Sequence, residues 1–194
     1  MKQDEFEKIR EQLLRNAAGK PGPAVLAIDG RCAAGKSTLG MKLAEAWDAP
    51  LFHMDDFYLQ AHQRTEERLA EPGGNVDRER FLLEVLLPLR RGEPVLYRPF
   101  DCHSMDFREA QQIAVKDIAI VEGSYACHPD LRDLYDLRIF MDIDPETQRE
   151  RLLRRNGPEG LQRFIERWIP LEERYFESCA VRDCCEILDK NQEL

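Results

Sequence analysis

An eight-residue motif near the N-terminus constrains the fold of this chain more than any other feature of its sequence. Residues 30–37 read GRCAAGKS and match the pattern G-x-x-x-x-G-K-[ST], whose glycines let the backbone curl so that successive N–H groups point at phosphate oxygens. The apolar run Ala24–Gly30 before the motif has the length of a strand buried on both faces. Apolar residues at helical spacing follow over Lys36–Trp47. This order of strand, glycine-rich loop and helix predicts a phosphate-binding loop.

The motif also predicts what its residues do. The Lys36 ammonium is expected to reach the β- and γ-phosphates of a nucleotide, and the Ser37 hydroxyl is expected to ligate Mg²⁺. The positive N-terminal end of the following helix adds to the attraction for phosphate. The residues expected to bind the nucleotide are Gly30, Ala33, Ala34, Gly35, Lys36, Ser37 and Thr38. The competing interpretation is a glycine-rich turn that carries a surface lysine.

Strand-like and helix-like patterns alternate along the rest of the chain. The predicted strands are 24–30, 50–57, 115–123, 137–144 and an edge strand at 185–189. The predicted helices are 4–18, 36–47, 77–89, 131–136, 145–155 and 163–177, with a break at 156–160 and an interruption near Pro170. The alternation predicts an α/β fold of three layers, in which helices cover both faces of a mostly parallel central sheet.

The length of 194 residues fits one domain. We expect this domain to span 1–194 and to contain three distinct parts. These are an N-terminal helix within 1–22, a substrate-binding insertion over 58–105 and a short lid region over 151–167. The insertion begins with a polar, turn-rich stretch over 59–78, which predicts a loop or an inserted lid.

Composition and charge exclude several classes of partner. The net charge of −9 argues against broad binding to nucleic acid or to anionic membranes, which requires a basic surface. No apolar run approaches the roughly 18 residues needed to span a bilayer, and the N-terminus has no apolar segment of the kind found in export signals. The six cysteines are therefore expected to be reduced thiols in a cytoplasmic protein. A homo-oligomer remains open.

Acidic residues at the ends of predicted strands are candidates for chemistry, because ligands of α/β sheets bind at the carboxyl ends of the strands. Asp55 and Asp56 are candidates for the base that accepts a hydroxyl proton, and Glu122 is a candidate for a carboxylate that reaches Mg²⁺. The alternatives are that the two aspartates cap a turn and that Glu122 is a loop residue. Asp142 and Asp144 also end a strand, but Asp144 precedes a proline and looks like a helix cap.

Arginines are concentrated in the lid region and in the helix that leads into it. Arg151 and Arg155 lie one turn apart on the same helical face and could neutralise phosphate charge, with Arg154 and Arg163 as further lid arginines. The alternative is a solvated helix whose arginines pair with neighbouring glutamates.

Three other residues have two interpretations each. The Cys32 thiol lies at a helix N-terminus, which could lower its pKa, but a small residue at a free position of the motif is the simpler interpretation. Trp168 and Phe176 are expected in the core rather than in a ligand site.

Several short motifs follow the glycine-rich loop in a fixed order: HMDDFYL (53–59), GGNVDRERF (73–81), YRPFDCHS (97–104), IVEGSYA (120–126) and RLLRR (151–155). This ordered set resembles the uridine kinase and phosphoribulokinase-like branch of P-loop kinases, to which nicotinamide riboside kinase is related. The resemblance implies the three-layer P-loop NTPase fold and transfer of a phosphoryl group from ATP, with Mg²⁺, to the 5′-hydroxyl of a nucleoside.

The resemblance also implies roles for individual residues. Asp55 matches the catalytic aspartate, Asp77 an aspartate that holds the ribose hydroxyls, and Glu122 the magnesium-linked glutamate. Phe100 and His103 match residues near the base, and Arg155 matches a lid arginine that meets the substrate.

The chain also departs from this family. Met54 and Asp56 replace the glutamine and serine that flank the catalytic aspartate in uridine kinases. Two alternatives therefore stay open: a kinase of a non-nucleoside alcohol such as pantothenate or a sugar phosphate, and a nucleotide-binding regulatory protein with weak ATPase activity.

Overall fold

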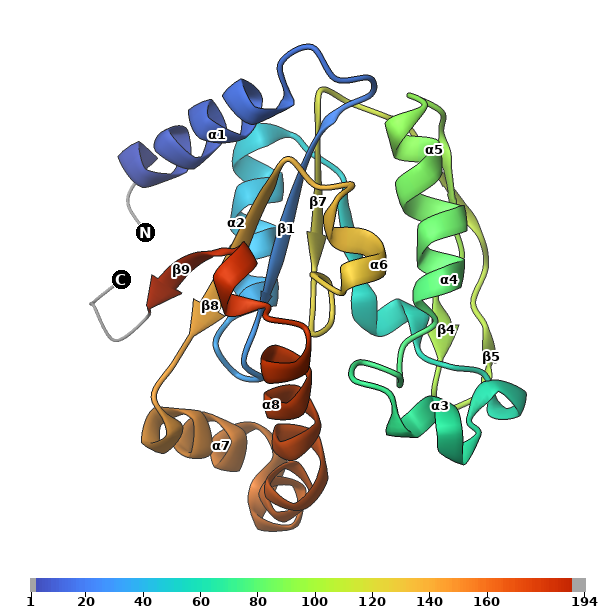
Figure 1. Ribbon diagram of the computed structural model, residues 1–194, viewed down its shortest axis with the longest axis vertical. Helices are drawn as coiled ribbons and strands as arrows, with labels where there is room; N and C mark the ends of the chain where they lie inside the picture. The colour runs from blue at the N-terminus through green and yellow to red at the C-terminus, as the bar shows by residue number, and fades with distance from the viewer. Residues whose placement is uncertain (1–2, 190–194) are drawn as a thin grey trace.

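A five-stranded parallel sheet forms the centre of the computed structural model, which describes residues 3–189 (Figure 1). The strand order is β2-β7-β1-β8-β9, and every neighbouring pair is parallel. The strands are β1 (Ala24–Gly30), β2 (Leu51–His53), β7 (Ile118–Glu122), β8 (Leu137–Asp142) and β9 (Glu186–Asp189). All seven residues of β1 are buried, as a strand covered on both faces requires. The predicted parallel sheet and its edge strand at the C-terminus are confirmed.

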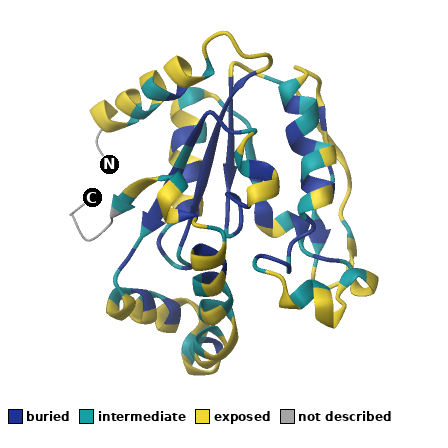
Figure 2. Ribbon diagram, in the orientation of Figure 1, coloured by how far each residue is buried: buried dark blue, intermediate teal, exposed yellow. Residues whose placement is uncertain are grey.

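Helices cover both faces of the sheet and complete the three predicted layers. On one face, α1 (Gln3–Ala17) and α2 (Lys36–Trp47) pack on Leu26 and Ile28 of β1. On the other face, Val25 and Ala27 of the same strand contact a second core. That core includes residues of the helix 78–90, of α6 (Pro129–Arg132) and of α8 (Ile169–Ser178). The alternation of side chains along β1 therefore divides the interior into two cores, and Figure 2 shows the buried strands between the two helical layers.

The second predicted strand is shorter than expected. Only Leu51–His53 forms β2, and Met54–Phe57 turns into a 3₁₀ helix. Met54 and Phe57 are both fully buried, and a 3₁₀ turn places residues three apart on one side. The turn thus buries both apolar side chains.

The segment predicted as a loop after this turn contains short helices. A 3₁₀ turn covers Ala61–Gln63, and α3 covers Glu66–Ala70. The next predicted helix is present as α4 (Arg78–Phe81), a π-helical turn over Leu82–Leu86 and α5 (Leu87–Arg90).

Two small antiparallel pairs follow that helix. They are β3 (Val95–Tyr97) with β6 (Gln111–Ile113), and β4 (Phe100–Asp101) with β5 (Asp106–Phe107).

The region predicted as a lid, 151–167, lies within two helical pieces. The first, α7 (Pro145–Arg163), is broken at Gly157, where φ is 68° and ψ is 179°, inside the predicted break. The second runs through a π-helical turn at Phe164–Trp168 into α8 and ends before a 3₁₀ turn at Arg182–Cys184. The expected interruption near Pro170 is present as this π-helical turn, which ends at Trp168, and the helix continues from there through the proline.

Within residues 3–189, no helix has both the length and the apolar character that crossing a membrane requires.

Candidate active site

A cleft of about 660 Å³ opens at the carboxyl ends of the central strands. Its walls come from the glycine-rich loop after β1, the turn after β2, the end of β7 and the lid region. Of the predicted site residues, the cleft is lined by Ala33, Gly35, Lys36, Ser37, Thr38, Asp55, Glu122, Arg151 and Arg155. Residues predicted from separate motifs are thus brought together.

The glycine-rich loop has the backbone that its glycines make accessible. Gly30 and Gly35 have φ values of 130° and 94°, a region that side chains disfavour. The Lys36 side chain folds back over the loop, and its Nζ donates to the carbonyl oxygens of Gly30 at 2.6 Å and of Arg31 at 3.0 Å. The ammonium is therefore held inside the curl of the loop.

Ser37 and Glu122 form an oxygen-rich corner beside the loop. The Ser37 hydroxyl donates to Glu122 Oε2 at 3.0 Å, and His53 Nδ1 lies 2.5 Å from Oε1 of the same carboxylate. This contact raises the pKa of His53 against the opposing effect of burial. Oxygen donors of this kind suit Mg²⁺, which is usually held by one or two protein oxygens together with substrate phosphates. Within residues 3–189, no group of three or more His, Cys, Asp or Glu is arranged so that it could hold a metal ion.

The two base candidates differ in where they point. Asp55 lines the cleft, and its Oδ1 accepts a hydrogen bond from the Tyr58 hydroxyl at 3.0 Å. Protein atoms around the cleft desolvate the Asp55 carboxylate and raise its pKa, while Lys36 and Tyr58 act in the opposite direction. Asp56 instead accepts from the Tyr97 hydroxyl at 2.5 Å. Of the two aspartates, Asp55 lines the cleft and Asp56 does not.

Two side chains of α7 donate hydrogen bonds to backbone carbonyl groups of the glycine-rich loop. From α7, Gln148 Nε2 donates to the Cys32 carbonyl oxygen at 3.1 Å, and Arg151 Nη1 donates to the Ala33 carbonyl oxygen at 3.2 Å. Arg151 and Arg155, predicted on the same helical face, both line the cleft. The other two lid arginines, at positions 154 and 163, are solvent-exposed and outside the lining.

Three residues assigned to the acceptor by the resemblance lie outside the cleft lining. The Asp77 carboxylate is 3% exposed and bonds to Gln63 Nε2 at 2.8 Å and to the Arg80 backbone N–H at 3.1 Å. Phe100 is buried, whereas His103 is exposed on the turn between β4 and β5.

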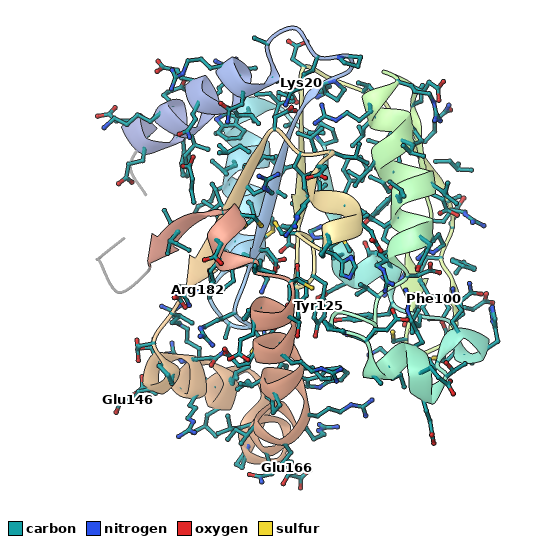
Figure 3. All side chains as sticks on the ribbon, viewed as in Figure 1. Lys20, Phe100, Tyr125, Glu146, Glu166 and Arg182 are labelled. Atoms are coloured by element: carbon teal, nitrogen blue, oxygen red, sulfur yellow. The ribbon has the colours of Figure 1, made fainter. Side chains whose placement is uncertain are left out.

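Several cleft residues were missed by sequence reasoning. Tyr58, Asn75 and Tyr125 line the cleft, and each lies within one of the motifs that carry the resemblance, at 53–59, 73–81 and 120–126. Trp168 also lines it, so its predicted place in the core is wrong, whereas Phe176 is buried as predicted. Figure 3 shows Tyr125 beside α8, and its ring centroid lies 4.9 Å from that of Tyr175.

The environment of Cys32 predicts an unreactive thiol. Burial and the neighbouring Glu172 raise its pKa to about 12 despite the adjacent helix N-terminus. We expect a maleimide at pH 7.5 to label the exposed Cys102 well before Cys32, as followed by peptide mass spectrometry. In Cys102→Ser, fast labelling of Cys32 would contradict this assignment.

Comparison with known proteins identifies the family. No protein-family model matches the chain. A uridine kinase from Staphylococcus epidermidis is 31% identical over 172 residues, which cover 79% of this chain and 81% of that protein.

Solved structures support the fold. A possible uridine kinase from Bacillus stearothermophilus superimposes with a TM-score of 0.71 at 19% identity, covering 96% of this chain and 98% of the other. A D-glycerate 3-kinase from Cryptococcus neoformans gives 0.66 at 16% identity, covering 99% and 96%. These likenesses confirm the three-layer P-loop fold. The uridine kinase relative, 31% identical and covered over most of its length, shows that the chain belongs to the uridine kinase family and is an ATP-binding phosphotransferase that acts on a hydroxyl group.

Proposed function

We propose that the chain transfers the γ-phosphoryl group of ATP to the 5′-hydroxyl of a nucleoside, with Asp55 as the base. The observation that carries this proposal is the position of Asp55, which lines the same cleft as the loop residues Lys36 and Ser37. Its raised pKa makes the carboxylate a stronger proton acceptor than an exposed aspartate. The uridine kinase relative supports a nucleoside as the acceptor.

In the proposed reaction, the acceptor oxygen attacks the γ-phosphorus while the bond from that phosphorus to the bridging β-phosphate oxygen breaks. Asp55 takes the hydroxyl proton, and ADP leaves. Lys36 and the backbone N–H groups of the loop bind the phosphates, and Arg151 and Arg155 face the charge that moves during transfer. Catalysis then depends mainly on positioning and electrostatics.

The corner formed by Ser37 and Glu122 fits the magnesium ion that such a reaction uses. Bound there, the ion would neutralise charge on the β- and γ-phosphates. Ser37 would be a direct ligand, and Glu122 would contact the ion directly or through water. His53 orients the Glu122 carboxylate through its hydrogen bond.

A second candidate function is phosphorylation of a non-nucleoside alcohol. The observation that favours it is that the Asp77 carboxylate already accepts hydrogen bonds from the Gln63 side chain and from the backbone at the N-terminus of α4. A ribose would have to displace Gln63 to reach Asp77. The resemblance in fold to a D-glycerate 3-kinase supports an acceptor of this other kind.

A screen with radiolabelled ATP tests both candidates. The panel contains uridine, cytidine, nicotinamide riboside, pantothenate, glycerate and a sugar phosphate, each with wild type and Asp55→Asn. We expect a labelled nucleoside product from wild type and almost none from the variant. Label transferred only to a non-nucleoside alcohol would replace the first candidate by the second. ATP binding without transfer to any alcohol would favour a regulatory protein.

A further inference from the structure

Glu172 is a buried carboxylate in the wall of the nucleotide cleft, 4% exposed. Its Oε2 accepts the backbone N–H of Cys32 at 3.0 Å, and its Oε1 accepts the Ser124 hydroxyl at 2.8 Å. Cys32 belongs to the glycine-rich loop, and Ser124 follows Glu122 by two residues at the end of β7. One side chain of α8 therefore joins the phosphate-binding loop to the segment that carries the candidate magnesium ligand.

A negative charge at this position is unfavourable for binding a nucleotide if only its Coulomb interaction is considered. A carboxylate in the cleft wall repels phosphate, and the low dielectric of a buried site increases that repulsion. If Glu172 assists nucleotide binding, it must therefore make a favourable interaction that outweighs this repulsion. The two hydrogen bonds are the available contribution, because bonds to a charged acceptor are stronger than neutral ones.

The neighbours of Glu172 on α8 reinforce the same junction. The Tyr175 hydroxyl donates to Asp29 Oδ2 at 2.8 Å, Glu173 pairs with Arg31, and the Arg31 guanidinium lies 5.9 Å from the centre of the Phe176 ring. This helix thus contacts the end of β1 and the start of the loop repeatedly.

The same helical piece also carries two side chains of the lid. Arg167 and Trp168 lie one turn before Glu172 and line the cleft with it. A shift of α8 relative to the loop would therefore move these lid side chains relative to the bound phosphates.

We propose that Glu172 is a positioning residue. It holds the glycine-rich loop and the segment at Ser124 in a fixed position relative to the side chains of Arg167 and Trp168. The loop amides are then oriented before the nucleotide enters, so that binding does not have to order them. This inference rests on the proposed function, in which the anion held by the loop is the phosphate chain of a nucleotide.

The test compares the binding of ADP to three variants by titration calorimetry. Glu172→Ala removes both the charge and the hydrogen bonds, whereas Glu172→Gln removes the charge and can keep both bonds, since its amide oxygen can accept from Cys32 and its NH₂ group can donate to Ser124. Glu177→Gln is the control, because this exposed glutamate lies on the same helix outside the cleft lining.

We expect Glu172→Ala to raise the Kd for ADP about tenfold or more, given the usual effect of losing hydrogen bonds to a charged group. Glu172→Gln should bind ADP as tightly as wild type or more tightly, and Glu177→Gln should match wild type. The proposal is overturned if Glu172→Ala binds ADP as tightly as Glu172→Gln, which is the outcome that Coulomb repulsion alone predicts.

A purely structural role would lower the Tm of Glu172→Ala and leave the Kd of the folded protein unchanged. If that variant does not fold, Ser124→Ala provides the same test with one hydrogen bond removed, and an unchanged Kd for ADP would overturn the proposal. ADP binding requires no acceptor, so failure of the proposed function would appear separately, as ADP binding without phosphorylation of any alcohol. Wild type that binds no ADP would overturn both.

Discussion

Replacing Asp55 by asparagine should lower kcat by about 10²- to 10⁴-fold, the usual contribution of a general base. Asparagine has nearly the same size and can still accept a hydrogen bond from Tyr58, but it cannot take the proton of the acceptor hydroxyl. The affinity for ADP should change little, because in the proposed reaction the phosphates are bound by the glycine-rich loop and not by Asp55. Steady-state kinetics with saturating ATP and acceptor, together with calorimetry for ADP, measure the two quantities.

Asp56→Asn is the matched control for this experiment. Asp56 is the adjacent aspartate, and it bonds to Tyr97 outside the cleft lining. Its replacement should leave kcat close to that of wild type, whatever it does to Tm. Equal losses of kcat in both variants would show that Asp55 has no special role in proton transfer.

The same assignment predicts the pH dependence of the reaction. Only the ionised Asp55 can accept a proton, and desolvation raises its pKa above the ordinary value of 3.8. Activity should therefore fall as the pH drops through this raised pKa, at a higher pH than an exposed aspartate would give. A profile of kcat/KM against pH measures this acid limb. The limb should disappear from the residual activity of Asp55→Asn.

Replacing Gly30 by alanine should destabilise the protein by more than about 3 kcal/mol. An alanine Cβ would lie 2.2 Å from the carbonyl oxygen and 2.6 Å from the nitrogen of Met141, and the backbone φ of +130° is strained for any side chain. Gly30 pairs with Met141 between β1 and β8, so the backbones cannot separate without disrupting the sheet. Thermal unfolding should show a Tm lower by at least about 6 °C for a chain of this size.

Gly92→Ala separates the steric clash from backbone strain. Gly92 also has a positive φ, +68°, but nothing lies within 4 Å of the position of its Cβ. This control should cost only about 1–2 kcal/mol, the usual penalty for a left-handed residue. If Gly30→Ala were no less stable than the control, the close packing of β1 on β8 would not limit this position.

The core of the site could be predicted from the sequence because its signals are local. The strand Ala24–Gly30 and the helix Lys36–Trp47 were predicted with the same bounds that the structure has. A buried strand, a glycine-rich loop and an amphipathic helix each depend on a short run of residues, whose spacing is visible without knowledge of the fold. Membership of a kinase family followed from the order of such runs.

Other parts of the site depend on contacts between residues far apart in the sequence. The resemblance assigned Asp77 to acceptor binding from its position in a motif alone. In the structure, its carboxylate accepts hydrogen bonds from the Gln63 side chain and from the backbone at the N-terminus of α4. Similarly, Trp168 is a large aromatic residue of the type usually found in cores, yet in the structure it lines the cleft.

The sequence by itself determined the phosphate-binding loop, the parallel sheet and the set of acidic and basic residues available for chemistry. Only the tertiary structure decided which of two adjacent aspartates faces the cleft, through the 3₁₀ turn that buries Met54 and Phe57. It also decided that Glu172 reaches Cys32, 140 residues away along the chain. The physical reason is that the periodicity of the sequence determines on which side of its helix or strand a residue lies. Which residue it contacts there depends on how the helices and strands pack against one another.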